Sequence, residues 1–220
     1  MNRWDPLSAD AAPAARSKQR RVAGELLARG IVVGLYAVLT RTLLLDFLHT
    51  GRITGLLLLA TESLVIVFTI ARRPALTVDR SAASIAATAV SIAGPLLVRT
   101  AAGAGILPDL ATTFLSGIGL SITIAAKLSL GRSFGIVPAN RGVVMSGVYN
   151  VVRHPIYAGY LVTHLAFTLA HPLLWNAVVL SVADMALMAR ALREERVLKA
   201  DDAYESYCRR VAWHVVPGVF

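Results

Sequence analysis

A basic pair at the start of an apolar segment is the first feature of the chain that could take part in chemistry. A glycine-rich, basic stretch that begins at Gly131 leads directly to Arg153, His154 and Pro155. Because proline is favoured at the first position of a helix, Arg153 and His154 are expected at a helix N-terminus. Free backbone N–H groups and the positive end of the helix dipole favour an anion there. The alternative is an Arg-His pair that only reaches to the lipid headgroups.

An acidic face follows on the next helix. Asp184, Ala191 and the Glu194-Glu195 pair recur at helical spacing and therefore share one side of a helix. Asp184 falls inside an apolar segment, so this side is not expected to face lipid. A solvated helix with an ordinary Arg190–Glu194 ion pair is the alternative, and it leaves Asp184 unexplained. Acidic groups opposite the basic N-terminus of the helix that begins at Pro155 suit a zwitterionic, partly cationic ligand.

Glu62 is a further candidate, because it lies in the middle of an apolar segment. A carboxylate in lipid is costly, so the residue is either functional or a protonated or partnered structural group. The single cysteine, Cys208, is expected to be structural. No cluster of ligands has metal-binding spacing, so no metal site is predicted. The remaining histidines are expected to be isolated: His49, His164, His171 and His214.

The composition indicates what must position these groups. The 220 residues are 56% hydrophobic and only 16% charged, with a mean hydropathy of +0.63. This excludes a disordered chain, a disulfide scaffold and a typical Rossmann enzyme, and it indicates a polytopic membrane protein. The net charge of +9 is interpreted as membrane topology and contact with anionic headgroups, so no nucleic-acid partner is predicted.

Six apolar segments predict an all-α integral membrane protein with about six transmembrane helices. The last two lie between Pro155 and Ala191 and are broken at His171-Pro172, so they are expected to form a helical hairpin. Gly117 and Gly119 would let helices approach closely. The other four segments are residues 24–45, 53–71, 81–98 and 110–128. The predicted organisation is a mobile cytosolic tail (1–21), a four-span scaffold (22–130), and a cofactor-binding loop, hairpin and tail (131–220).

The basic residues predict the orientation. Most Lys and Arg side chains fall in the N-terminal tail, the loop after the second segment, the loop before the fifth, and the C-terminal tail. Only Arg41, Arg52 and Arg99 fall on the opposite side. The positive-inside rule therefore places both termini in the cytosol.

Several residues of the C-terminal part together resemble the isoprenylcysteine carboxyl methyltransferase family. The phospholipid N-methyltransferases share the same pattern. The resemblance covers residues 131–218 and leaves the first four apolar segments without a recognisable motif. The residues that carry it are Arg153-His154-Pro155-x-Tyr157-x-Gly159, then Glu194-Glu195, then Tyr204-x-x-Tyr207 and Val216-Pro217.

The resemblance implies a methyltransferase of the plasma or inner membrane that uses S-adenosylmethionine in a cytosol-facing pocket. Arg153 would be the catalytic residue, as partner for a carboxylate of the cofactor or acceptor. The acceptor would be a lipophilic small molecule or prenylated group with a carboxylate, surrounded by membrane lipids. A carboxylate is already ionised, so positioning and water exclusion would suffice. The implied cofactor-binding residues are Gly147, Tyr149, His154, Tyr157, Gly159, Glu194, Glu195, Tyr204 and Tyr207.

Two other functions remain open. The first is an NADPH-dependent membrane reductase of the sterol or steroid type, which resembles this chain in an RHP-like loop. Such enzymes usually have asparagine in the place of Ile156 and lack the Glu-Glu pair. The second is a non-catalytic, lipid-binding membrane protein. The sequence leaves the acceptor's identity, the oligomeric state and the roles of Glu62 and Asp184 undecided.

Overall fold

The computed structural model describes residues 33–71, 75, 77–135 and 138–220. The chain divides into two units, Met1–Val38 and Leu39–Phe220. In the first unit, the described residues 33–38 are helical. The predicted cytosolic tail, residues 1–21, lies outside the described residues.

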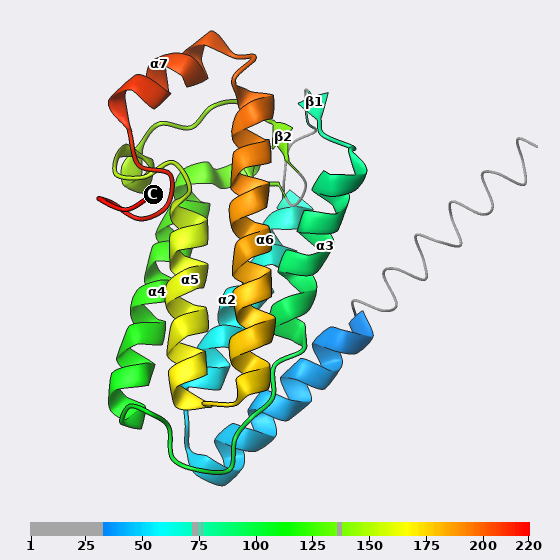
Figure 1. Cartoon of the computed structure of the whole chain (residues 1–220), viewed down its shortest axis with the longest axis vertical. Coiled ribbons are helices and arrows are strands. Elements are labelled where there is room, and N and C mark those ends of the chain that lie inside the picture. The colour runs from blue at the N-terminus through cyan, green and yellow to red at the C-terminus, as the bar shows by residue number, and fades with distance from the viewer. Residues whose placement is uncertain (1–32, 72–74, 76, 136–137) are drawn as a thin grey trace, which may run out of the picture. The chain divides into compact units, whose positions relative to one another are not determined.

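The second unit is built almost entirely from helices (Figure 1). Residues 39–50 are helical. Two short strands pair antiparallel, with Thr77 opposite Asn140 and Val78 opposite Ala139. The all-α prediction is therefore confirmed apart from this small ladder. The elements that follow are α2 (Thr54–Ala71), β1 (Thr77–Val78), α3 (Ala82–Leu96), α4 (Asp109–Leu130), η2 (Gly131–Ser133), β2 (Ala139–Asn140), η3 (Gly147–Asn150), α5 (Pro155–Ala170), α6 (Leu174–Leu198) and α7 (Asp202–Arg210).

Small residues allow the helices of the bundle to pack closely. Helix α4 packs along α5, α3 packs along α6, and α2 contacts both α4 and α5. A Cβ atom added to Gly119 would lie 2.8 Å from the carbonyl oxygen of Gly159, and one added to Gly159 would lie 2.7 Å from that of Gly119. The predicted packing role of Gly119 is confirmed, whereas Gly117 faces open space.

Gly119→Ala is expected to destabilise the protein by about 1–3 kcal/mol, because the added methyl group meets backbone atoms that cannot give way. The measurement is thermal unfolding in detergent. Gly117→Ala on the same helix is the control, and it is expected to leave stability equal or slightly higher because alanine is the better helix former. Equal effects of the two variants would contradict the packing role of Gly119.

The membrane-spanning character of the bundle is supported at two helices. The segments Asp109–Ser133 and Leu174–Leu198 are long and apolar enough to cross a membrane. The apolar helices Thr54–Leu64 and Ala82–Leu96 are shorter, so the number of six spans stays a prediction. Helices α5 and α6 lie side by side and are joined by residues 171–173, which form the expected hairpin (Figure 1).

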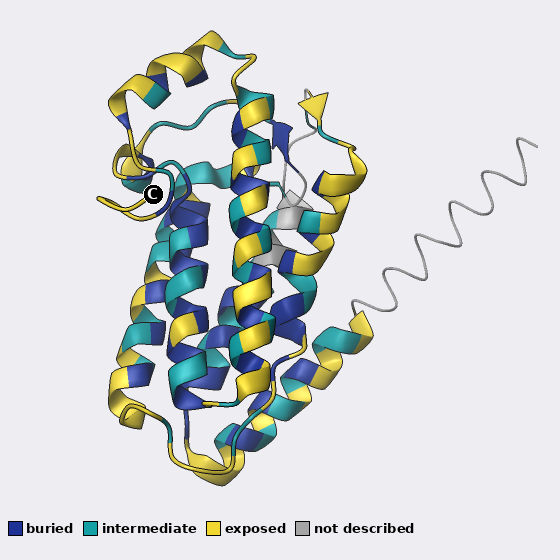
Figure 2. Ribbon diagram, in the orientation of Figure 1, coloured by how far each residue is buried: buried dark blue, intermediate teal, exposed yellow. Residues whose placement is uncertain are grey.

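Exposed residues lie on the outer faces of the long helices (Figure 2), and several of them are apolar. On α4, Leu110 is 82% exposed and Phe114 is 70% exposed. On α6, Leu174 is 81% exposed and Met185 is 64% exposed. Exposed apolar surface of this kind on helices indicates contact with lipid or with a partner.

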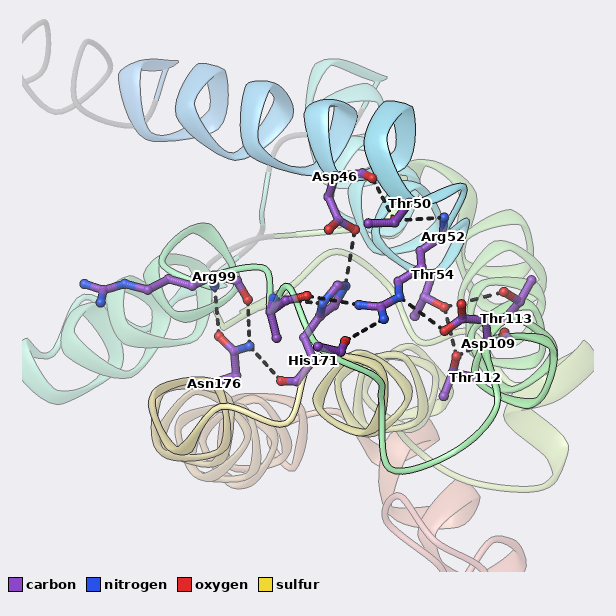
Figure 3. A network of polar contacts seen from close by, with 12 residues as sticks. Asp46, Thr50, Arg52, Thr54, Arg99, Asp109, Thr112, Thr113, His171 and Asn176 are labelled. Atoms are coloured by element: carbon purple, nitrogen blue, oxygen red, sulfur yellow. Dashed lines mark hydrogen bonds and ion pairs between the residues drawn. The ribbon is translucent and has the colours of Figure 1, made fainter.

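A buried polar network closes one end of the bundle (Figure 3). The guanidinium of Arg52 donates to the carbonyl oxygens of Ala101 (3.0 Å) and Gly103 (2.6 Å). His171 Nδ1 accepts from the Ala101 N–H at 3.1 Å, and its Nε2 lies 3.6 Å from Asp46 Oδ2. These contacts fasten the loop between α3 and α4 to the α5–α6 turn, so the network is explained by structure alone.

Candidate functional site

One cavity is lined by residues of η3, α5 and α7 and also by residues of α2, α3 and α6. It contains about 1040 Å³ of space free of atoms, including solvent at its mouth. Aromatic residues of η3, α5 and α7 line its outer part, and Glu62 and His164 line its inner part. Its wall therefore changes from aromatic and basic at the outer end to acidic at the inner end.

Glu195 is buried beside this cavity, and both oxygens of its carboxylate contact other side chains of the protein. Its Oε1 lies 3.0 Å from His154 Nε2 and 2.5 Å from His214 Nδ1. Its Oε2 accepts a hydrogen bond from Arg153 Nη1 at 3.2 Å. The carboxylate thus joins α6 to the start of α5 and to the C-terminal tail. The predicted contact of Glu195 with a cofactor is untested, but the geometry gives it a structural role.

Arg153 also donates hydrogen bonds to the C-terminal tail. Its Nε donates to the carbonyl oxygen of Val211 at 2.7 Å, and its Nη2 donates to that of Cys208 at 3.1 Å. The backbone N–H groups of Arg153 and His154 donate to tail carbonyl oxygens at 2.9 Å and 2.7 Å. The folded-back tail therefore accepts the hydrogen bonds of these two N–H groups, and the expectation that an anion binds at the helix N-terminus stays a prediction. The catalytic role of Arg153 stays a prediction.

Glu194 differs from its neighbour because it lines the cavity. Its Oε2 accepts a hydrogen bond from the Tyr157 hydroxyl at 2.9 Å. The Tyr157 ring stacks on His154 with centroids 5.3 Å apart and planes 5° apart. The Arg190 guanidinium lies 5.5 Å from the Tyr157 ring centroid. The two adjacent glutamates therefore have different surroundings. Glu195 is bonded to protein groups, whereas the Glu194 carboxylate lies in an aromatic part of the cavity.

The other predicted tyrosines lie at the outer part of the same cavity. Tyr149, Tyr204 and Tyr207 all line it. The Tyr207 hydroxyl donates to the carbonyl oxygen of Tyr149 at 2.7 Å. Burial raises the pKa of Tyr207 to about 12, so this hydroxyl stays protonated and keeps donating at neutral pH. The bond links α7 to η3 and fixes the aromatic wall.

The two predicted glycines are not among the cavity-lining residues. Gly147 has a φ of +64°, and an added Cβ would lie 3.4 Å from Ser129 Cβ and closer still to the hydroxyl. Gly159 lies at the close contact between α4 and α5. Their predicted contact with a cofactor stays a prediction, while the structure explains both by backbone geometry and packing.

Two buried cations escaped the sequence interpretation. Arg190 lines the cavity, donates through Nη2 to the Gly135 carbonyl oxygen at 2.9 Å, and has a buried Nε without a hydrogen-bond partner among the described residues. Lys127 is fully buried and donates to the Tyr160 hydroxyl at 3.0 Å. The spacing of Arg190 to Glu194 was the available signal, and it was compatible with an ordinary surface ion pair.

Three histidines that were expected to be isolated have acidic neighbours. His164 Nδ1 lies 2.6 Å from Asp184 Oδ1, and His214 Nδ1 lies 2.5 Å from Glu195 Oε1. His171 faces Asp46 in the network at the far end of the bundle. The expectation was wrong for these three because each partner comes from a different segment of the chain.

One histidine cluster has the composition of a metal site. Donor atoms of His154, Glu195 and His214 all lie within 4.8 Å of one another. The Arg153 guanidinium on the same carboxylate opposes the binding of a second cation, because like charges repel at this distance. The three residues come from separate segments, so spacing along the sequence could not indicate the cluster. The absence of a metal stays a prediction.

Comparison with known proteins finds a similarity in the C-terminal part of the bundle. Residues 110–204 match the family model of the phospholipid methyltransferases, the family that contains the isoprenylcysteine carboxyl methyltransferases. The match spans α4, the loop that follows it, α5, α6 and the start of α7. No curated protein matches the chain.

Proposed function

We propose that the protein is an integral membrane methyltransferase that uses S-adenosylmethionine, since residues 110–204 match the family model of the phospholipid methyltransferases. The observation that carries the proposal is the cavity in which Glu194 faces aromatic walls. Both termini are proposed to lie in the cytosol, with the outer end of the cavity on the cytosolic side.

The residues present fit the chemical groups of S-adenosylmethionine. The molecule has an aromatic base, a ribose, a cationic sulfonium, an ammonium and a carboxylate. The Glu194 carboxylate accepts a hydrogen bond from Tyr157, and the further acceptor capacity of a carboxylate suits an ammonium or ribose hydroxyl. The rings of Tyr149 and Tyr204 suit the base and the sulfonium, since cations are attracted to aromatic faces. Arg190 is placed to meet a carboxylate.

The bound cofactor would supply an electrophilic methyl group, and the chain would bind and orient the acceptor. A lipophilic acceptor is proposed because the cavity continues from the tyrosines to the middle of an apolar bundle. A carboxylate acceptor is proposed because the sequence resemblance implies it. The second candidate is an acceptor whose reacting atom carries a proton that must be removed, such as an amine or a thiol. Glu62 and His164 line the inner part of the cavity and support this candidate.

Calorimetric titration of S-adenosylmethionine and NADPH into detergent-purified protein tests the proposal. We expect binding of S-adenosylmethionine alone. Glu194→Gln is expected to weaken that binding about 10- to 100-fold, because a hydrogen bond to a charged group contributes about 1.5–3 kcal/mol. Glu205→Gln, at an exposed site on α7, is the matched control and should bind like the unaltered protein.

Other results would point to the other two functions. Binding of NADPH in place of S-adenosylmethionine would support the membrane reductase. Binding of neither would contradict the proposal and favour a lipid-binding protein without catalysis.

A further inference from the structure

A buried lysine stands beside the cavity, and the proposed cofactor contacts do not use it. Lys127 lies in the last turn of α4, where the helix dipole favours a cation. A lysine at a helix end can extend its flexible side chain to the lipid headgroups, yet this side chain is 0% exposed. Its Nζ lies 5.6 Å from the ring centroid of Phe134 and 5.2 Å from that of Tyr160. The dipole therefore explains a cation on this turn but not its burial against two rings that line the cavity.

The hydrogen bond of this lysine determines what the neighbouring phenol can do. Lys127 Nζ donates to the Tyr160 hydroxyl oxygen at 3.0 Å. An ammonium has no lone pair, so it can only donate, and the phenol oxygen is the acceptor. Among the residues that the structure describes, no group accepts the Tyr160 hydroxyl proton in return. Tyr160 is 7% exposed and lines the cavity, so its O–H is a buried donor that remains available to a ligand.

Tyr160 lies between the two ends of the cavity. It follows Tyr157 by three positions and precedes His164 by four, so the three side chains share one face of α5. All three line the cavity. Tyr157 binds Glu194 in the part proposed for the cofactor, and the His164 ring stacks on that of Tyr160 with centroids 6.0 Å apart. A ligand group at the Tyr160 hydroxyl would therefore lie between the proposed cofactor and the inner end of the cavity.

The charges at the inner end balance within the protein. His164 lies 2.6 Å from Asp184 Oδ1 and 3.8 Å from Glu62 Oε1. A histidine between two carboxylates is favoured as an imidazolium that donates toward both. One negative charge of this cluster is then left, and the buried ammonium of Lys127 offsets it. An anionic group bound at Tyr160 would thus meet no uncompensated negative charge.

We propose that Tyr160, held by Lys127, binds an anionic oxygen of the methyl acceptor and determines specificity for the charged acceptor over its neutral methylated product. This inference rests on the proposed methyltransferase function and assigns residues of α4 and α5 to acceptor recognition. A hydrogen bond to an ionised oxygen is roughly twice as strong as one to a neutral oxygen. The ammonium of Lys127 polarises the phenol, which strengthens the bond that the phenol donates.

Tyr160 keeps its proton throughout the proposed step. One oxygen of a carboxylate acceptor accepts the hydrogen bond of the phenol, and the other oxygen attacks the methyl carbon. The new oxygen–carbon bond forms as the methyl–sulfur bond of the sulfonium breaks, and the bonding electrons stay on sulfur. The product is a neutral ester, which accepts a weaker hydrogen bond from Tyr160 than the anion did. The Lys127–Tyr160 pair therefore favours exchange of the product for a new acceptor.

The test compares hexanoate with methyl hexanoate as probes, by saturation-transfer NMR in detergent. We expect the unaltered protein to bind hexanoate about tenfold more tightly than its ester. Tyr160→Phe keeps the ring and should weaken hexanoate binding about 10- to 100-fold, as expected for the loss of a hydrogen bond to a charged group, while methyl hexanoate binding changes far less. Lys127→Met should shift the same preference in the same direction. In turnover with labelled S-adenosylmethionine, Tyr160→Phe should raise the KM for hexanoate.

The matched control is Thr112→Val, which removes another buried hydroxyl of α4. Thr112 bonds to Thr54 at 3.2 Å and does not line the cavity. The control should keep the preference for hexanoate even where its thermal stability falls. The ratio of the two affinities is the decisive readout, because a purely structural defect would weaken both probes alike. Calorimetric binding of S-adenosylmethionine should be unchanged in Tyr160→Phe, which also shows that this variant is folded.

The inference would be overturned, with the proposed function intact, by any of three results. The unaltered protein binds S-adenosylmethionine but does not prefer hexanoate, or Tyr160→Phe keeps the preference. In the third result, Tyr160→Phe weakens binding of S-adenosylmethionine and leaves hexanoate unaffected, which would assign the phenol to the cofactor's own carboxylate. Failure of the unaltered protein to bind S-adenosylmethionine would instead contradict the proposed function.

Discussion

Replacement of Glu195 by leucine is expected to lower the free energy of unfolding by about 3–5 kcal/mol, the usual effect of removing one partner from a buried ionic cluster. Glu195 is 4% exposed, and its two oxygens contact Arg153, His154 and His214. Without the carboxylate, a buried guanidinium and two imidazoles lose their shared acceptor. Thermal unfolding in detergent and limited proteolysis of the C-terminal segment would measure the loss.

The neighbouring Glu194 provides the control for this prediction. Glu194→Gln keeps an acceptor for the Tyr157 hydroxyl, so its stability should stay close to that of the unaltered protein while binding of S-adenosylmethionine weakens. If Glu195→Leu stayed fully stable and lost only cofactor binding, Glu195 would be a direct ligand contact. The implied cofactor role of both glutamates would then hold.

The helices near the site were predictable where a local signal marks them. Helix α5 begins at Pro155 because proline fits the first helical position and lacks the N–H that this position would leave unpaired. The break between α5 and α6 follows from Pro172, which cannot continue a helix. Helix α7 begins after Asp201, whose side chain accepts from the Ala203 N–H. Each of these helix ends depends on residues that are neighbours in the sequence, so the sequence pattern is sufficient to predict them.

The contacts of the site depend on long-range folding and were not predictable in the same way. Glu194 and Glu195 differ by about one hundred degrees around a helix, and only packing decides which of them meets the cavity. The tail that covers the helix mouth returns across more than fifty positions, as the bond from Arg153 to Val211 shows. Asp184 was recognised as unsuited to lipid, but its partner His164 became visible only with α5 and α6 side by side.

The number of membrane spans illustrates a different limit. Apolar composition marks a segment as buried or lipid-facing, but it does not fix helix length. Helix α3 ends at Leu96, just after the internal Pro95, and has 15 residues, and α5 has 16. Both are shorter than the roughly 20 residues that usually cross a bilayer. Segments of this length are compatible with a bundle whose short helices are held by longer neighbours.

Arg153→Lys is expected to lower the free energy of unfolding by about 3 kcal/mol, although both side chains carry one positive charge. The guanidinium donates at once to Glu195 and to the carbonyl oxygens of Val211 and Cys208. A lysine has a single ammonium at a different reach, so it cannot reproduce this fork, and each lost charge-assisted bond costs about 1.5–3 kcal/mol.

The measurement for Arg153→Lys is the thermal midpoint in detergent, followed by the affinity for S-adenosylmethionine below that midpoint. We expect a lowered midpoint together with weakened binding, because a loosened tail no longer supports Tyr207 and Tyr149 in the cavity wall. Arg209→Lys, at an exposed i,i+4 pair with Glu205, should change neither quantity. An unchanged midpoint with lost turnover would contradict the positioning role. It would favour direct contact of Arg153 with the ligand, as the family resemblance implies.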